Sequence, residues 1–107
     1  MKKSKKPEIT PEQLLGDYNK IMANKGIVFF NAPWCQPCQV LKPVMDQIAG
    51  EGIPVKSVNI DYDTILTENY SPKSVPTLVI TDMGGTEIKR AAAGGWSKEQ
   101  VLNWFNS

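Results

Sequence analysis

Apolar residues recur along this chain in two patterns, one with the spacing of helices and one with the short runs of strands. Helical spacing predicts four helices, within residues 9–26, 35–52, 61–70 and 97–106. Short apolar runs predict four strands, at residues 26–31, 53–60, 77–82 and 86–92. The last two strands are joined across the sequence MGG, and we expect them to form an antiparallel hairpin.

Two of the predicted helices carry clear start signals. In the first, Thr10 and Gln13 have the spacing of a capping box, and in the last, Ser97 and Gln100 repeat it. The helix after the first strand has apolar residues near a period of 3.6, at Val40, Leu41, Val44, Met45 and Ile48. Pro43 falls inside that helix and is expected to kink it, because proline lacks the donor for the i−4 hydrogen bond.

The order of these elements predicts the fold class. Strands that alternate with helices favour a parallel central pair joined by a right-handed crossover. The antiparallel hairpin is then expected at one side of the same sheet. The sequence therefore predicts an α/β domain with a mixed central sheet.

Composition places the chain among single-domain globular proteins, with 107 residues of which 41% are hydrophobic and 21% charged. Four of the 12 basic residues lie within residues 1–6, and the other eight stand against 11 acidic residues, a balance of −3. We expect a basic, flexible tail at 1–6 and one domain at 7–107. Four lysines without interleaved aromatic residues are not a nucleic-acid-binding pattern, so no nucleic-acid partner is expected. Neither a membrane-length apolar run nor a signal-peptide apolar segment is found, so a cytoplasmic location is expected.

The chain has two cysteines, Cys35 and Cys38, and no histidine. The lack of histidine excludes Cys–His and Ser–His–Asp catalytic arrangements. Structural zinc needs about four ligands, so zinc could be held only if two chains pooled their thiolates. That zinc-bridged dimer and a pair of inert core thiols stay open as alternatives to a reversible disulfide.

The spacing of the two cysteines suits a redox switch. Residues three apart on a helix lie about one turn from each other, so two sulfurs there can open and close a bond. The closed loop is too small to restrain the unfolded chain much. Cys35 is predicted at the first turn, where free N–H groups favour a thiolate, and Cys38 one turn further in. We therefore expect Cys35 to attack a substrate disulfide and Cys38 to release the product.

Four blocks of sequence together resemble the thioredoxin family: APWCQPCQVLKP, VNID, SVPTLVI and, after a glycine-containing turn, SKEQVLNWF. The similarity runs from about Ile27 to the C-terminus, and more faintly through the first helix. It implies a thioredoxin-like three-layer fold, with a central mixed sheet of four to five strands flanked by helices. It also implies an enzyme, a thiol–disulfide oxidoreductase that reduces protein disulfides by dithiol–disulfide exchange.

The resemblance also implies which residues form the site. They are the catalytic Cys35 and Cys38, the substrate-binding Trp34, Val75, Pro76 and Gly94, and the motif-shaping Gln36 and Pro37. Pro76 matches the family's cis-proline, which would leave the backbone of Val75 free to pair with an extended substrate. The implied partners are disulfide-containing proteins and a thioredoxin reductase or equivalent electron donor. We expect a monomer with no metal and no cofactor beyond the Cys35–Cys38 disulfide.

The chain departs from the family at three positions. Phe29 stands where thioredoxins usually carry a buried aspartate, and Ser57 stands where its lysine partner is expected. Loss of both members of a buried ion pair can be neutral for stability, whereas loss of one is costly. Gln36 replaces the usual glycine between the cysteines. The missing ion pair keeps a rival hypothesis open, a non-catalytic binding module that uses a thioredoxin-like surface.

Several other residues are predicted to have mainly structural roles. Asp61 and Asp63 are expected to be turn or cap residues rather than acid–base groups. Trp104 is predicted to pack partly on the last helix. For Trp96, an extension of the apolar rim around the cysteines and packing against the last helix are both open.

Overall fold

The computed structural model describes residues 25–107, and the predicted basic tail and first helix lie outside this part of the chain. Its elements are β1 (Gly26–Asn31), α2 (Gln36–Gly50), β2 (Val55–Asn59), α3 (Thr64–Tyr70), β3 (Thr77–Thr81), β4 (Glu87–Ala92) and α4 (Lys98–Asn106). Each of them matches an element predicted from the apolar pattern. Within residues 25–107 no helix has the length and apolar character needed to cross a membrane.

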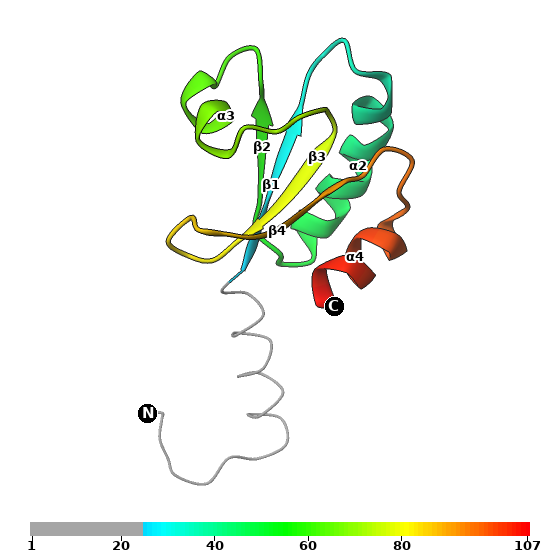
Figure 1. Cartoon of the computed structure of the whole chain (residues 1–107). Coiled ribbons are helices and arrows are strands. Elements are labelled where there is room, and N and C mark those ends of the chain that lie inside the picture. The colour runs from blue at the N-terminus through cyan, green and yellow to red at the C-terminus, as the bar shows by residue number, and fades with distance from the viewer. Residues whose placement is uncertain (1–24) are drawn as a thin grey trace, which may run out of the picture.

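The four strands form one mixed sheet in the order β2-β1-β3-β4. Strands β1 and β2 are parallel, and α2 connects them, while β3 is antiparallel to both β1 and β4. The predicted parallel pair with a hairpin at one side is therefore confirmed. Figure 1 shows α2 and α4 on one side of the sheet and α3 on the other, which gives three layers.

Side chains of β1 alternate between the two faces of the sheet and so contribute to two cores. Ile27 and Phe29 belong to the larger core, which α2 and α4 complete with Leu41, Met45, Ile48, Val101 and Phe105. Val28 and Phe30 belong to a smaller core with Val58 and Val79, against which Leu66 and Tyr70 of α3 pack. Burial on both faces explains why β1 reads as a continuous apolar run rather than an alternating one.

Helix α2 begins directly after Cys35, which is its N-cap residue, and Pro37 lies in its first turn. Proline is tolerated there because the first N–H groups of a helix have no partner within the helix. The predicted apolar face is confirmed for Leu41, Met45 and Ile48, but Val40 is 61% exposed. Its place next to Leu41 puts it beyond the edge of the buried stripe, so its assignment to that face was wrong.

Both ends of α4 are held by specific contacts. The predicted capping box forms, with Ser97 accepting from the Gln100 N–H and the Gln100 side chain accepting from the Ser97 N–H. At the other end the Lys89 ammonium donates to the Trp104 carbonyl at 2.7 Å. Trp96 packs edge-to-face on Trp104, with 5.7 Å between ring centroids, which favours the packing role for Trp96.

Candidate functional site

The topology brings the two cysteines and the Val75–Pro76 loop to the same end of the sheet. Strand β1 ends where β3 begins, since Phe30 is paired with Thr77, and β4 ends beside them, since Thr77 is also paired with Ala92. The loop before α2, the segment before β3 and the turn after β4 therefore meet at one edge. Strand β2, parallel to β1, also ends there and leads into Asp61.

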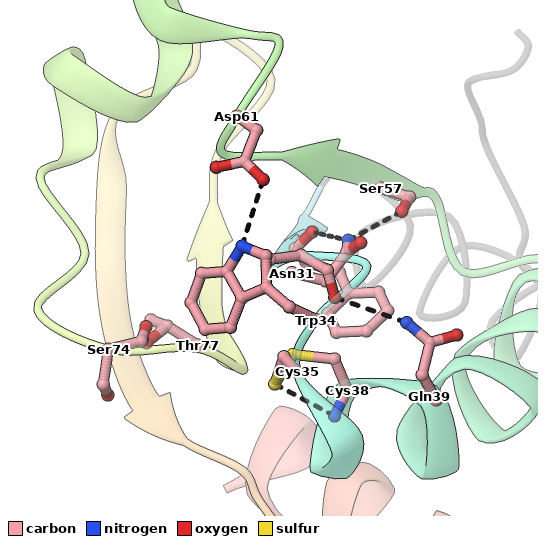
Figure 2. The surroundings of a disulfide bond; sticks show 11 residues. Asn31, Trp34, Cys35, Cys38, Gln39, Ser57, Asp61, Ser74 and Thr77 are labelled. Carbon is pink, nitrogen blue, oxygen red and sulfur yellow. Dashed lines mark hydrogen bonds between the residues drawn. A yellow bond between two sulfur atoms is a disulfide. The ribbon is translucent and has the colours of Figure 1, made fainter.

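Cys35 and Cys38 form a disulfide at the start of α2, with 5.2 Å between their Cα atoms (Figure 2). Cys35 is 5% exposed and Cys38 is 1% exposed, so the predicted order of exposure is confirmed. The Cys38 N–H donates to the Cys35 sulfur at 3.2 Å. When the disulfide is open, this N–H and the positive end of the helix dipole favour a thiolate at Cys35.

Apolar residues surround the two sulfurs. Ala32 and both cysteines form a small buried cluster, and Ile60 and Val75 pack against it. Trp34, next to Cys35, is 66% exposed. An exposed aromatic side chain beside a reactive disulfide provides a surface that another protein can contact.

Gly94 lies beside Pro76 and beside Pro37, the residue that precedes Cys38. The Val75–Pro76 peptide bond is cis. A side-chain carbon placed on Gly94 would lie 3.7 Å from Pro37 and 3.8 Å from Pro76, whereas one on Gly95 would meet nothing within 4 Å. Gly94, and not its neighbour Gly95, is therefore the glycine that faces both prolines.

The backbone groups of Val75, next to the cis-proline, are unpaired within residues 25–107. Within the described part of the chain neither its N–H nor its carbonyl hydrogen-bonds to another residue, while the next carbonyl, of Pro76, accepts from the Ala93 N–H at 3.3 Å. A free donor and acceptor next to the disulfide are the groups that an extended peptide pairs with when it adds to a sheet edge.

Asp61 has a role that the sequence did not reveal. Its carboxylate accepts a hydrogen bond from the Trp34 indole N–H at 3.1 Å, and Figure 2 shows the indole pointing toward it. The Asp61 N–H in turn donates to the Asn59 side chain at 2.9 Å. Asp63 is the N-cap of α3, as predicted. No spacing rule could have linked Trp34 to Asp61, because strand pairing brings them together.

Two of the three departures from the thioredoxin pattern lie side by side on neighbouring strands. Phe29 and Ser57 are in register on β1 and β2. Phe29 is 1% exposed, so an apolar ring fills the place of the family's buried aspartate. Ser57 accepts a hydrogen bond from the Asn31 amide at 2.9 Å, and that amide also donates to the Phe29 carbonyl. Hydrogen bonds between uncharged groups therefore pair the Asn31 amide and the Ser57 hydroxyl here, in place of an ion pair.

A cysteine pair that closes at a helix N-terminus, next to an exposed tryptophan, is suited to thiol–disulfide exchange. The fold and the site define the class of protein as a thiol–disulfide oxidoreductase with a thioredoxin-like fold. The family model described as Thioredoxin matches residues 11–107. The chain belongs to the thioredoxin family.

Individual relatives agree with this assignment. Thioredoxin from Haemophilus influenzae is 28% identical over 96 residues, covering 84% of this chain and 88% of that protein. Thioredoxin from Rickettsia typhi is 35% identical over 83 residues, covering 75% and 77% of the two chains. A single-substitution mutant of thioredoxin from Halobacterium salinarum shares the fold, with a TM-score of 0.70 at 23% identity, covering 92% of this chain and 84% of that one.

Proposed function

We propose that this protein reduces disulfides in other proteins, with Cys35 as the nucleophile and Cys38 as the resolving thiol. The Cys35 thiolate attacks one sulfur of the substrate disulfide, and the other sulfur leaves as a thiolate that takes up a proton. Cys38, losing its own proton, then attacks the Cys35 sulfur and displaces the second substrate thiolate. Two electrons pass to the substrate, and the Cys35–Cys38 disulfide forms.

The hydrogen bond from the Cys38 N–H to the Cys35 sulfur carries this assignment. It favours negative charge on Cys35, which is also the more exposed of the two cysteines. No cofactor beyond the disulfide is needed for the exchange. A thioredoxin reductase or an equivalent donor would return the electrons, and we place the protein in the cytoplasm as a monomer.

The substrate-binding residues of the proposal are Trp34, Val75, Pro76 and Gly94, while Gln36 and Pro37 shape the turn between the cysteines. Trp34 offers exposed apolar area beside Cys35. The free backbone groups of Val75 would pair with an extended segment of the substrate. Gly94 keeps the space between Pro37 and Pro76 open for that segment.

The direction of electron flow is tested by equilibrating the Cys35–Cys38 pair with glutathione. A protein that reduces other disulfides is expected to have a potential more negative than about −230 mV, close to that of thioredoxins and below glutaredoxins. The reduced fraction is measured by trapping free thiols at a series of glutathione ratios. A potential of about −180 mV or higher would instead indicate an isomerase or an oxidant.

Removal of the Asp61 carboxylate is expected to weaken substrate binding. In Asp61→Ala the Trp34 indole loses its hydrogen bond and is no longer held in one orientation, so the KM for insulin rises about two- to five-fold, the cost of one exposed hydrogen bond. The kcat and the redox potential should stay unchanged, because the sulfurs are not touched. Asp46→Ala, which removes an exposed carboxylate on α2, is the control. An unchanged KM in Asp61→Ala would show that the bond has no role in binding.

A further inference from the structure

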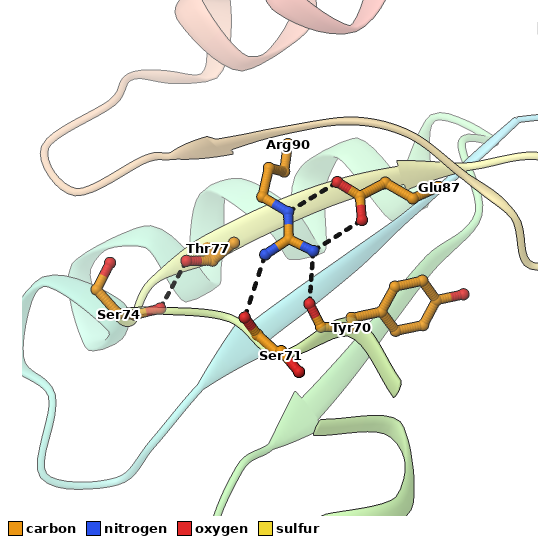
Figure 3. Close-up of polar contacts among 6 residues, drawn as sticks. All are labelled: Tyr70, Ser71, Ser74, Thr77, Glu87 and Arg90. Atoms are coloured by element: carbon orange, nitrogen blue, oxygen red, sulfur yellow. Dashed lines mark hydrogen bonds and ion pairs between the residues drawn. The ribbon is translucent and has the colours of Figure 1, made fainter. Parts of the chain in front are cut away.

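Arg90 on β4 connects the edge strand to the C-terminal end of α3 (Figure 3). One terminal nitrogen of its guanidinium donates to the Tyr70 carbonyl, and the other donates to the Ser71 carbonyl at 3.3 Å. Tyr70 is the last residue of α3, and Ser71 is its C-cap, in the left-handed backbone region with φ 48°. The last carbonyls of a helix have no partner within the helix, and a positive group near them is favourable.

Glu87 holds the Arg90 side chain in this orientation. Its two carboxylate oxygens accept from Nε and from a terminal nitrogen of Arg90, both at 2.7 Å. Two parallel hydrogen bonds fix the plane of the guanidinium as well as its position. The pair lowers the pKa of Glu87 through the hydrogen bond from Arg90, so the carboxylate is charged at neutral pH.

The segment that Arg90 holds leads directly to the proposed substrate-binding backbone. Three residues separate Ser71 from Val75, and the first of them is Pro72, whose φ is fixed by its ring. At the far end of the segment the Thr77 hydroxyl donates to the Ser74 carbonyl at 2.6 Å. The two contacts therefore fix the segment on both sides of Pro72 and Lys73, immediately before Val75.

We propose that Arg90 is a positioning residue for substrate binding, which fixes residues 71–75 so that the Val75 backbone meets an extended substrate. This inference rests on the proposed function of Val75. Arg90 would touch neither the substrate nor the sulfurs and would act only through the segment it holds. Its loss should therefore affect substrates that pair with backbone and spare those that only need a sulfur to be accessible.

The test compares two disulfides in single-turnover reactions of the pre-reduced full-length protein. Insulin offers a polypeptide backbone, and dithiobis(nitrobenzoic acid) is a small aromatic disulfide without one. For Arg90→Ala we expect the second-order rate constant with insulin to fall about five-fold, the factor for losing one well-placed hydrogen bond. The rate constant with the small disulfide and the redox potential should not change.

Lys89→Ala provides the matched control, because Lys89 is the neighbouring residue on β4 and bonds to α4 instead of the 71–75 segment. Both variants are expected to lower the melting temperature, but only Arg90→Ala should lower the insulin rate relative to the small-disulfide rate. Arg90→Lys keeps the charge without the planar fork and should also lose insulin rate. It serves as the test variant if Arg90→Ala does not fold.

Two results would overturn the inference and can be told apart. The first is a ratio of the insulin rate to the small-disulfide rate that does not change in the Arg90 variant, or that falls equally in Lys89→Ala. Either finding shows that Arg90 only stabilises the fold. Failure of the unaltered protein to reduce insulin overturns the proposed function itself, and this inference with it.

Discussion

Replacing Cys35 by serine is expected to abolish the reduction of insulin disulfides, leaving a rate lower by roughly three orders of magnitude or more. The serine hydroxyl is not ionised near neutral pH and cannot take the place of the thiolate as nucleophile. The effect should exceed that of any change at the surrounding surface, because Cys35 forms the first bond to the substrate. Insulin precipitation after addition of pre-reduced protein measures it.

Cys38→Ser is the matched control for that experiment. This variant keeps the Cys35 nucleophile at the helix start but lacks the thiol that releases the substrate, so it should accumulate a mixed disulfide with insulin. Non-reducing gel electrophoresis detects the adduct. Reduction of insulin by Cys35→Ser at the rate of the unaltered protein would contradict the assigned roles.

The same variants separate the enzyme from a binding module. A module that only holds partner proteins on this surface has no need of sulfur chemistry. A double Cys35→Ala, Cys38→Ala variant that kept its partners and its biological role would therefore favour the binding module. The oxidoreductase predicts that this variant loses the role together with the activity.

Local sequence signals predicted the elements that they directly encode. The capping box of Ser97 and Gln100 marks the start of α4, and the Asp63 cap marks that of α3. The apolar run of β1 predicted a strand buried on both faces. In these cases the residues that decide the structure lie within a few positions of each other, so spacing alone carries the information.

Local spacing signals could not predict contacts between residues that are distant in the sequence. Asp61 meets Trp34, 27 positions away, only because β1 and β2 end side by side. Arg90 reaches the end of α3, 19 to 20 positions back, because the fold brings the edge strand β4 near the C-terminal end of that helix. The exposed position of Val40 depends on where the flanking elements leave α2 uncovered. Each case is set by tertiary packing, which no periodicity records.

Phe29 and Ser57 replace both members of the buried ion pair that the family pattern carries. In the family pattern these positions carry an aspartate and a lysine, and here they are in register on neighbouring strands about 5 Å apart. The phenyl ring of Phe29 joins the larger core with Leu41 and Met45. This chain therefore gains apolar burial at a place where the family pattern bears the desolvation cost of two buried charges.

Restoring the aspartate alone is expected to be the most destabilising of the substitutions considered. Phe29→Asp removes a fully buried ring and places a carboxylate without a cationic partner in the core, lowering the free energy of unfolding by more than about 4 kcal/mol. Burial would raise the pKa of the new carboxyl. The variant should therefore bind a proton on folding, lose the least stability at low pH, and lose more as pH rises through the raised pKa. Urea unfolding at several pH values measures both effects.

The double variant Phe29→Asp, Ser57→Lys tests whether the pairing of these two positions across β1 and β2 is enough to restore the buried ion pair. Ser57 is exposed, so Ser57→Lys by itself should change stability by less than about 0.5 kcal/mol. In the double variant a lysine in register can reach the buried carboxylate, and we expect about 1–3 kcal/mol of the loss to be recovered as a coupling energy. Phe29→Leu, which keeps an apolar side chain, separates the packing loss from the charge. Strictly additive single effects would mean that the site has repacked around Phe29 so far that the two positions no longer interact.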